Sequence, residues 1–237
     1  MLLRLFLLVL VLLIFGALGR GGKCRDKDMN CAVWVATDKD QCVNAQLVTK
    51  SCDRSCGVCG EQIEPKFDIR HIPKDLVPLA WLVGRWRSEF GGKAFFPTIP
   101  KFTYGEQINF EIVDSTRPSL NYTAFAWDIN MPDGDPTEIH SENGYLTVEK
   151  DGTVTLTTAM SNGFMTIETG DVGQNQIKFS LQKIGRISFS HDSAVRSMYR
   201  DWTMLDERRL EARLLMTTTV TRRLMEHTAV VYEKIYP

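Results

Sequence analysis

The stretch GYLTVEKDGTVTLTTA, residues 144–159, decides the fold class of this 237-residue chain. Apolar side chains alternate with polar ones on both sides of the pair Asp151-Gly152. A period of two gives a β-strand one apolar face, and an Asp-Gly pair between two such runs is a strong signal for a tight turn. We therefore predict an antiparallel β-hairpin centred on this pair.

Strand patterns continue from residue 78 to the end of the chain. NQIKFSLQKI (175–184) alternates, and GRISFS (185–190) would place Ile187 and Phe189 on one face of a further strand. One short helical turn is expected in DLVPLAWL (75–82), just before the first strand. Many short strands with few helical stretches are typical of a β-sandwich or an up-and-down β-barrel, and periodicity leaves both open.

The chain begins with MLLRLFLLVLVLLIFGALGR, a short basic segment followed by an unbroken apolar run. Small residues follow where a signal peptidase would cut, so residues 1–19 are expected to be a secretory signal peptide and the protein to be extracellular. An uncleaved anchor is the alternative, although the run is shorter than the roughly 20 residues that a membrane span needs. The net charge of −1 gives no electrostatic argument for nucleic acid or a membrane surface.

All six cysteines lie in the short stretch after this segment. An even number of crowded cysteines in an exported chain predicts a disulfide framework, because so short a segment cannot bury enough apolar area to fold alone. Spacing alone leaves the 15 possible pairings open. A zinc site is the alternative, since Cys56-Gly-Val-Cys59 has the spacing of metal ligands.

The cysteine stretch resembles a ShKT domain, the module of sea-anemone potassium-channel toxins and many nematode secreted proteins. The matching residues are Cys24, Asp26, Cys31, Trp34, Cys42, Asn44, Cys52, Ser55, Cys56, Gly57 and Cys59. The resemblance implies short helices and the pairs Cys24–Cys59, Cys31–Cys52 and Cys42–Cys56. Channel blockers carry a Lys-Tyr pair where this chain has Leu47-Val48, so we interpret residues 24–59 as an extracellular accessory or interaction domain. Residues 60–77 are expected to be a linker to a second domain, 78–237.

The closing stretch TRRLMEHTAVVYEKIYP, residues 221–237, raises a separate question. Strict alternation puts His227 in one row with Met225, Ala229 and Val231, while the other row carries the charges. His227 is therefore expected to face the interior, with space beside the small Ala229. A buried imidazole needs a hydrogen-bonding group, a water or a metal, because leaving its nitrogen unsatisfied costs about 1–3 kcal/mol.

Residues 79–110, LAWLVGRWRSEFGGKAFFPTIPKFTYGEQINF, resemble the opening of the nitrobindin family of haem-binding β-barrels. HSENGYLTV, GRISFSHD, MTTT and HTAVVYEKIYP match further family segments in the same order. The resemblance implies a roughly ten-stranded antiparallel barrel with ferric haem b near one mouth. It also implies that His227 is the axial iron ligand, that Thr98 lies beside the haem, and that His140 and Met216 line the cavity. Family members bind nitric oxide and are credited with isomerising peroxynitrite to nitrate.

The chain departs from the family pattern at three positions. Ser88 and Phe90 replace two glycines of the loop after Trp86, and Phe96 stands where a tyrosine usually precedes Pro-Thr-Ile. The closing segment also has about one extra residue between MTTT and His227. We expect these differences to alter contacts at the rim of a haem site while leaving the axial ligand in place.

The remaining candidates are weaker. His71 and His191 are expected to be solvated, and Asn121-Tyr-Thr123 is a glycosylation sequon within an expected strand, so its use stays open. No hydrolase triad or nucleotide-binding motif stands out. Three functions follow: a haem protein that binds nitric oxide or isomerises peroxynitrite, a non-catalytic carrier of haem or a fatty-acid-like ligand, and an extracellular interaction protein.

Overall fold

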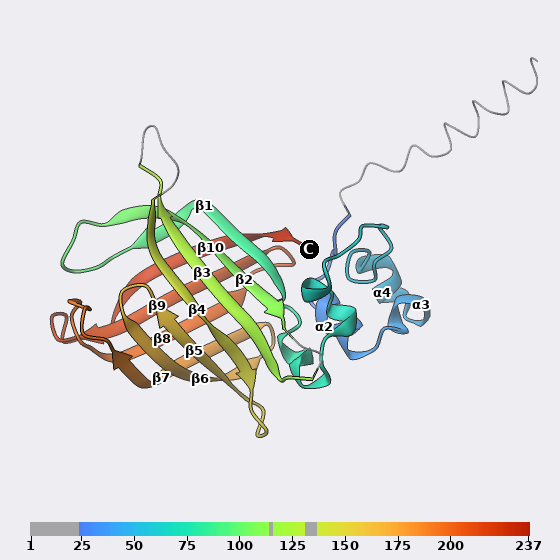
Figure 1. Ribbon diagram of the computed structural model, residues 1–237. Coiled ribbons are helices and arrows are strands. Elements are labelled where there is room, and N and C mark those ends of the chain that lie inside the picture. Colours follow the sequence, from blue (N-terminus) through green and yellow to red (C-terminus); the bar gives the residue numbers. More distant parts are fainter. Residues whose placement is uncertain (1–23, 114–115, 131–136) are drawn as a thin grey trace, which may run out of the picture.

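The structure, a computed structural model, describes residues 24–113, 116–130 and 137–237; the expected signal peptide lies outside these ranges. Ten antiparallel strands of the described residues close into one barrel in the order β1-β10-β9-β8-β7-β6-β5-β4-β3-β2 (Figure 1). The barrel thus decides between the two architectures that periodicity left open. Its strands are β1 (Gly84–Ala94), β2 (Phe102–Ile112), β3 (Ser119–Asp128), β4 (Glu138–Val148), β5 (Thr153–Met160), β6 (Phe164–Gly173), β7 (Gln176–Arg186), β8 (Val195–Met204), β9 (Arg209–Thr218) and β10 (Met225–Tyr236).

The predicted hairpin is confirmed as the pair β4–β5. Leu146 lies opposite Leu156, and both side chains are fully buried in the barrel. Gly152 takes a φ of 87°, a left-handed conformation that glycine adopts without a steric penalty. The Asp-Gly turn therefore sets a register that keeps every second side chain in the core.

The expected strand in residues 185–190 is wrong. β7 ends at Arg186, and the chain then turns, with Ser190 N donating to the carbonyl of Ile187 at 3.1 Å. The Arg186 guanidinium also donates to the carbonyl of Ser190, which holds the turn closed. Ile187 and Phe189 alternate in the sequence, yet they are 44% and 58% exposed at the end of the barrel.

The N-terminal module consists of three short helices, α2 (Cys31–Thr37), α3 (Gln41–Asn44) and α4 (Gln46–Ser51). Disulfides join Cys24 to Cys59, Cys31 to Cys52 and Cys42 to Cys56, which are the pairs that the ShKT resemblance implies. Cys56 and Cys59 have different partners, so they do not form a zinc pair. No helix among the described residues is both long and apolar enough to pass through a bilayer.

Residues 60–79 contain short 3-10 helices that pack the module against the barrel. These are η1 (Pro65–Phe67), η2 (Ile69–His71) and η3 (Lys74–Leu79), and the last contains the helical turn expected before the first strand. Phe67 and Leu76 are fully buried, and the Phe67 ring meets Tyr236 of β10 edge-on at 5.3 Å. The side-chain amide of Asn175, in the β6–β7 turn, also donates to the Asn30 side chain of the module at 3.1 Å. Module, connecting segment and barrel share one continuous apolar core.

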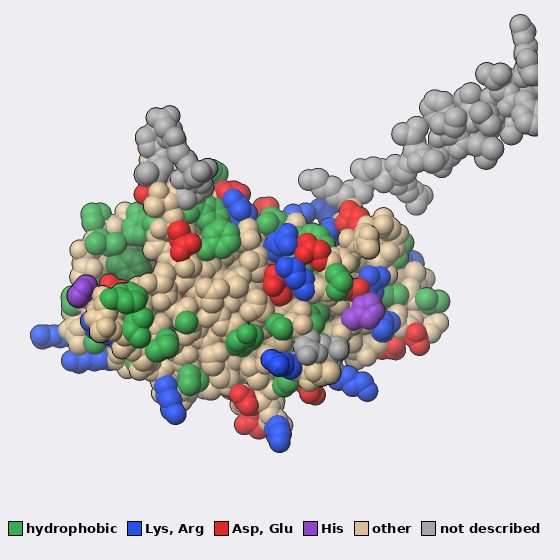
Figure 2. All heavy atoms as spheres, in the orientation of Figure 1, with side chains coloured by type: hydrophobic (Ala, Val, Ile, Leu, Met, Phe, Trp, Pro, Cys, Tyr) green, Lys and Arg blue, Asp and Glu red, His purple; other side chains and the backbone are tan. Residues whose placement is uncertain are grey.

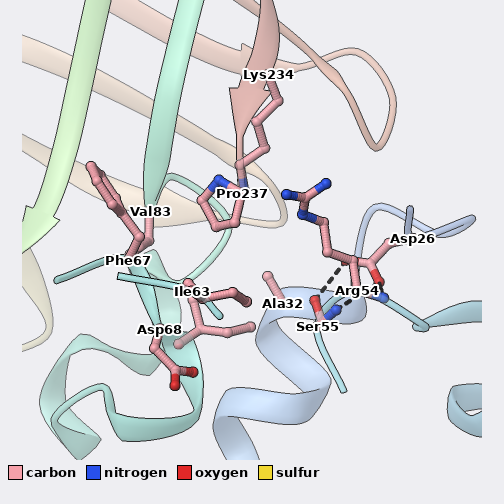
Figure 3. Close-up of a pocket in the computed structure, with 11 residues that line it drawn as sticks. Asp26, Ala32, Arg54, Ser55, Ile63, Phe67, Asp68, Val83, Lys234 and Pro237 are labelled. Carbon is pink, nitrogen blue, oxygen red and sulfur yellow. Dashed lines mark hydrogen bonds between the residues drawn. The ribbon is translucent and has the colours of Figure 1, made fainter. Parts of the chain in front are cut away.

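Figure 3 shows the seam between the module and the barrel. On the module side, the Asp26 carboxylate accepts hydrogen bonds from the backbone of Arg54 and from the Ser55 hydroxyl, the latter at 2.6 Å. On the barrel side, burial lowers the pKa of Lys234 to about 8. The seam encloses only ≈ 30 Å³, so it is close-packed.

Two tryptophans plug the barrel at the module end. Trp81 and Trp86 are almost completely buried, and Trp86 Nε1 donates to the carbonyl of Leu82 at 2.7 Å. The interior space is therefore displaced toward the opposite end of the barrel, where the loops β1–β2, β5–β6, β7–β8 and β9–β10 surround a mouth.

Candidate functional site

The barrel encloses a cavity of ≈ 550 Å³ that opens at the mouth, a size typical of sites for small organic ligands and cofactors. Its walls near the mouth are mainly apolar, and its inner end is polar. The apolar wall includes Phe96, Ile99, Phe102, Ile139, Met160, Phe164, Ile184, Val195, Met198, Leu214, Met216 and Val220. All four residues that the haem resemblance implies, Thr98, His140, Met216 and His227, line this one cavity.

His227 lies on β10 with only 1% of its surface exposed. Its Nδ1 is 3.0 Å from the carbonyl oxygen of Met225. A carbonyl can only accept, so Nδ1 carries a proton in this contact, and in the neutral imidazole the lone pair is then on Nε2. A neutral imidazole whose other nitrogen is fixed by the backbone is the usual form of an iron or zinc ligand.

The row in which His227 lies is not the one that alternation predicts. The register between β10 and β9 shifts between Glu226 and Thr228, so a β-bulge lets both His227 and Thr228 line the cavity. Beyond the bulge, Val230 and Tyr232 are buried and face the cavity, while Val231 is 39% exposed. His227 faces inward as predicted, but Ala229 and Val231 do not share its row, because the extra residue of the bulge reverses the alternation.

The departures from the family pattern have clear structural consequences. Phe96 packs edge-on against the His227 imidazole, with ring centroids 5.6 Å apart, so the phenyl ring supports the orientation of the histidine. Ser88 is buried and its hydroxyl accepts from Gly91 N at 3.0 Å. The pairing of β1 with β2 is interrupted between Ser88 and Gly92, and Phe90 is 74% exposed there.

A network of buried charges forms the inner end of the cavity. Arg200 on β8 lies between Glu142 of β4 and Glu168 of β6, with closest nitrogen–oxygen distances of 3.1 Å to each. The Tyr122 hydroxyl donates to Glu142 at 3.0 Å, and Nε2 of His140 lies 3.3 Å from the same carboxylate. On the other side, Thr166 donates to Glu168 at 2.9 Å. Every charged group of this network therefore has a polar partner, as burial requires.

The pKa values of the titratable groups in and beside this network are shifted in different directions. Burial would raise the pKa of Glu142, but the Arg200 guanidinium and His140 outweigh it and hold this pKa far below its usual range. Burial disfavours the imidazolium of His140, yet the hydrogen bond with Glu142 raises its pKa overall. Burial raises the pKa of Glu106 to about 7, and the charge of Glu142 adds to this, while the Tyr232 hydroxyl opposes it. Glu106 thus exchanges a proton near neutral pH.

The sequence carries a usable signal for this network, although His140 is its only member among the predicted site residues. Glu142 shares an inward row with Leu146, and Arg200 shares one with Met198 and Trp202. A charged residue inside an otherwise buried row, with opposite charges on different strands, predicts an internal ion pair. Glu106 lies in the stretch 79–110 that resembles the family, but no role was predicted for it.

The other candidates do not line the cavity. The His71 side chain is 71% exposed, with its Nδ1 3.0 Å from Asp68, and His191 is exposed at the mouth. Asn121 is half-buried on β3, and its amide donates to Glu111 at 3.4 Å.

Comparisons with known proteins agree with this site. A family model described as "THAP4-like, heme-binding beta-barrel domain" matches residues 75–234. A Caenorhabditis elegans protein is 70% identical over 91% of this chain and 74% of its own length. The peroxynitrite isomerase THAP4 of Bos taurus is 31% identical over 68% of this chain, and the match spans only 26% of the bovine protein.

Two smaller proteins match over most of their length. A peroxynitrite isomerase of Arabidopsis thaliana is 31% identical over 68% of this chain and 89% of its own. The crystal structure of Rv2717c from M. tuberculosis superimposes with a TM-score of 0.58 and 30% identity, covering 69% of this chain and 98% of that one. With a matched family model and a closed barrel around a histidine-lined cavity, the chain belongs to the THAP4-like haem-binding β-barrel family, and haem is its cofactor.

Proposed function

We propose that the protein binds ferric haem b through Nε2 of His227, and that the bound haem takes up nitric oxide or isomerises peroxynitrite to nitrate. The observation that carries this proposal is the state of the His227 imidazole: it is buried in the cavity wall, with Nδ1 fixed by the Met225 carbonyl. Relatives that are named peroxynitrite isomerases support the choice of substrate.

The residues of the cavity fit haem in three respects. Its volume of ≈ 550 Å³ is in the range that cofactors occupy. Phe96, Phe102 and Met216 offer an apolar wall for a porphyrin, and burial of apolar area supplies most of the binding energy for such a ligand. Thr98 is exposed on the mouth loop, where its hydroxyl can meet the polar edge of a macrocycle.

Bound haem supplies an iron centre at which a small ligand can bind and react. The chain supplies the environment. The Met225 carbonyl holds the tautomer of His227, and Phe96 restricts the rotation of its ring. His140, held by Glu142, places a polar group in the cavity wall, and the plugged module end limits access to the mouth.

A fatty-acid carrier fits the inner cavity less well. Arg200 is already neutralised by Glu142 and Glu168, and Glu106 adds a third carboxyl group. A ligand carboxylate in this position would meet an excess of negative charge, which costs several kcal/mol at short range in a low-dielectric interior.

The proposal extends to the location of the protein. Six cysteines paired in three disulfides fit export to an oxidising compartment, so we expect the chain to be extracellular. The ShKT-like module would then act as an interaction domain, and mass spectrometry of the secreted chain would show whether its N-terminus is Arg20.

The first test is an absorption titration with haemin. The wild-type chain should develop a Soret band with 1:1 stoichiometry, and His227→Ala should lose or strongly shift it. His71→Ala removes an exposed histidine outside the cavity and serves as the matched control. An unchanged band in His227→Ala would contradict axial ligation, and equal losses in both variants would point to a general folding defect.

The second test concerns the reaction. Stopped-flow decay of peroxynitrite, with nitrate and nitrite measured as products, should show faster nitrate formation with the haem-loaded chain than with the chain alone. A normal haem spectrum without acceleration would leave nitric oxide binding, which is measured from the spectral shift on addition of the gas.

A further inference from the structure

Three neighbouring loops form a continuous arc on the mouth of the barrel. Residues 95–101, 187–194 and 219–224 join β1 to β2, β7 to β8 and β9 to β10. Since the strands follow in the order β1-β10-β9-β8-β7, these loops lie next to one another around the rim. We call them the rim arc.

The rim arc exposes large apolar side chains from each of its loops. Ile99 is 49% exposed, Phe189 58% and Val220 53%, and Ile187 and Leu224 are 44% and 48% exposed. Figure 2 shows hydrophobic side chains on the surface at this end of the barrel, away from the module. Ile99 and Val220 also border the cavity, so the exposed apolar surface continues into the interior.

Cations flank these apolar tips. Lys93, Lys101, Arg196, Arg222 and Arg223 are exposed on the rim arc and the strand ends that carry it. The three loops, whose residues are all described, contain one acidic residue, Asp192. Its carboxylate accepts a hydrogen bond from the Asn162 amide at 2.9 Å. The strand ends also carry Glu226 at the start of β10, and its carboxylate is paired with Arg213. The exposed charge of the rim arc and its strand ends is therefore mainly positive.

We propose that the rim arc docks on the surface of a lipid bilayer that contains anionic headgroups. Apolar tips beside lysine and arginine are the pattern of interfacial binding, in which apolar groups enter the headgroup boundary and cations stay at the phosphates. The complementary charge favours an anionic bilayer over a neutral one. In this orientation the mouth faces the lipid and the N-terminal module points away from it (Figure 1).

The docking face has a consequence for the cavity. An amphipathic ligand that partitions into lipid, as haem does through its apolar macrocycle, would pass between bilayer and cavity without crossing bulk water. Docking is measured on the chain without haem, so the two proposals can fail independently.

The test is co-sedimentation of the chain, without haem, with two kinds of vesicle. One contains phosphatidylcholine alone, and the other also contains about 30% phosphatidylserine, which gives it a strong negative surface potential. Wild type should bind the anionic vesicles at least about tenfold more tightly than the neutral ones, and added salt should weaken the binding. Variants and wild type share one N-terminus, so any contribution of residues 1–19 is common to all.

Two double variants separate the electrostatic contribution to vesicle binding from the apolar one. Arg222→Asn with Arg223→Gln should lower affinity for anionic vesicles about tenfold, and asparagine suits the positive φ of 54° at residue 222. Ile99→Ser with Phe189→Ser should lower affinity by a similar factor and make the remaining binding more sensitive to salt.

The matched control is Val43→Ser with Leu47→Ser, which removes two exposed apolar side chains from the module end, 82% and 59% exposed in the wild type. This control should bind like wild type. The proposal is overturned if wild type stays in the supernatant with anionic vesicles, or if the control loses as much binding as the rim variants. Circular dichroism checks that each variant retains its sheet.

Discussion

Arg200 is the residue on which the interior polar network depends. It is 7% exposed and pairs with Glu142 and Glu168, which are 7% and 1% exposed. Buried ion pairs add little net stability when complete, but removing one partner leaves charges that water cannot reach. The network therefore contributes more to keeping the cavity polar at one end than to the stability of the barrel.

Replacing Arg200 by methionine should destabilise the protein strongly. Two carboxylates would lose their counter-charge, with an expected cost of about 3–5 kcal/mol in the free energy of unfolding. Urea denaturation measures this value. Arg213→Met, which breaks the exposed pair with Glu226, is the control and should cost less than about 1 kcal/mol. Similar losses in both variants would contradict the account of Arg200.

Glu106 should make stability fall as pH rises through neutrality. Its folded-state pKa of about 7 lies above the ordinary value of 4.5, so the folded protein holds this proton more tightly than the unfolded chain. The stability that the protonated Glu106 contributes is fully present below pH 4.5. It is lost as pH rises through about 7, which lowers the free energy of unfolding by up to about 3 kcal/mol.

The measurement for Glu106 is the free energy of unfolding of wild type and Glu106→Gln between pH 5 and 8. The variant should gain on wild type as pH rises, since it carries no titrating group there. Glu142 has the opposite sign, because its lowered pKa gives stability that is lost as pH falls, but it is present in both proteins. Parallel curves would show that Glu106 does not titrate in this range.

At the scale of the element, β10 combines a regular ladder with one irregular position. From Thr228 onward it pairs with β9 residue by residue, and the register shift just before Thr228 turns His227 into the cavity. The Phe95 backbone also donates to the His227 carbonyl at 2.8 Å, which ties the bulge to the mouth loop. The bulge therefore positions the candidate ligand.

Deletion of Glu226 should abolish haem binding while leaving the barrel folded. Without the extra residue, regular alternation would turn His227 outward, so haem uptake measured by the Soret band should be lost. Far-ultraviolet circular dichroism should show that the sheet remains. Glu226→Ala keeps the length of the strand and is the control, which should still bind haemin. Normal haemin binding by the deletion variant would show that the bulge is dispensable.

Much of the fold follows from local patterns, and part of the site does not. The hairpin around Gly152 was predictable because turn chemistry and alternation agree. The bulge at His227 was not, because one extra residue leaves no trace in a period-two pattern. Ile187 and Phe189 misled the strand prediction for a related reason: alternating apolar residues at the mouth look like a strand whether they face a core or solvent. His227 was found through its position in a buried row and the family resemblance together.

At the scale of the whole molecule, the module is a structural part of the barrel. Cys31 and Cys52 are buried in the same apolar core as Phe67 and Trp86, and the connecting segment lies between them. A hydrogen bond from Asn175 to Asn30 crosses directly from barrel to module. Destabilising the module should therefore also destabilise the barrel.

Replacing Cys31 and Cys52 by alanine tests this coupling. Loss of the disulfide should lower the stability by about 2–5 kcal/mol, and thermal unfolding should remain a single transition at a lower temperature. Circular dichroism of the sheet, followed during heating, measures it. Two separate transitions, with the barrel unchanged, would show instead that the module and the barrel unfold independently.

Trp81 and Trp86 fill the module end of the barrel, so among the described residues the cavity is reached from the mouth. A cofactor bound at His227, near the mouth, would lie between bulk water and the charged groups of Glu142 and Arg200 farther inside. Loading with the cofactor would therefore slow the exchange of water and small solutes with the inner end of the cavity.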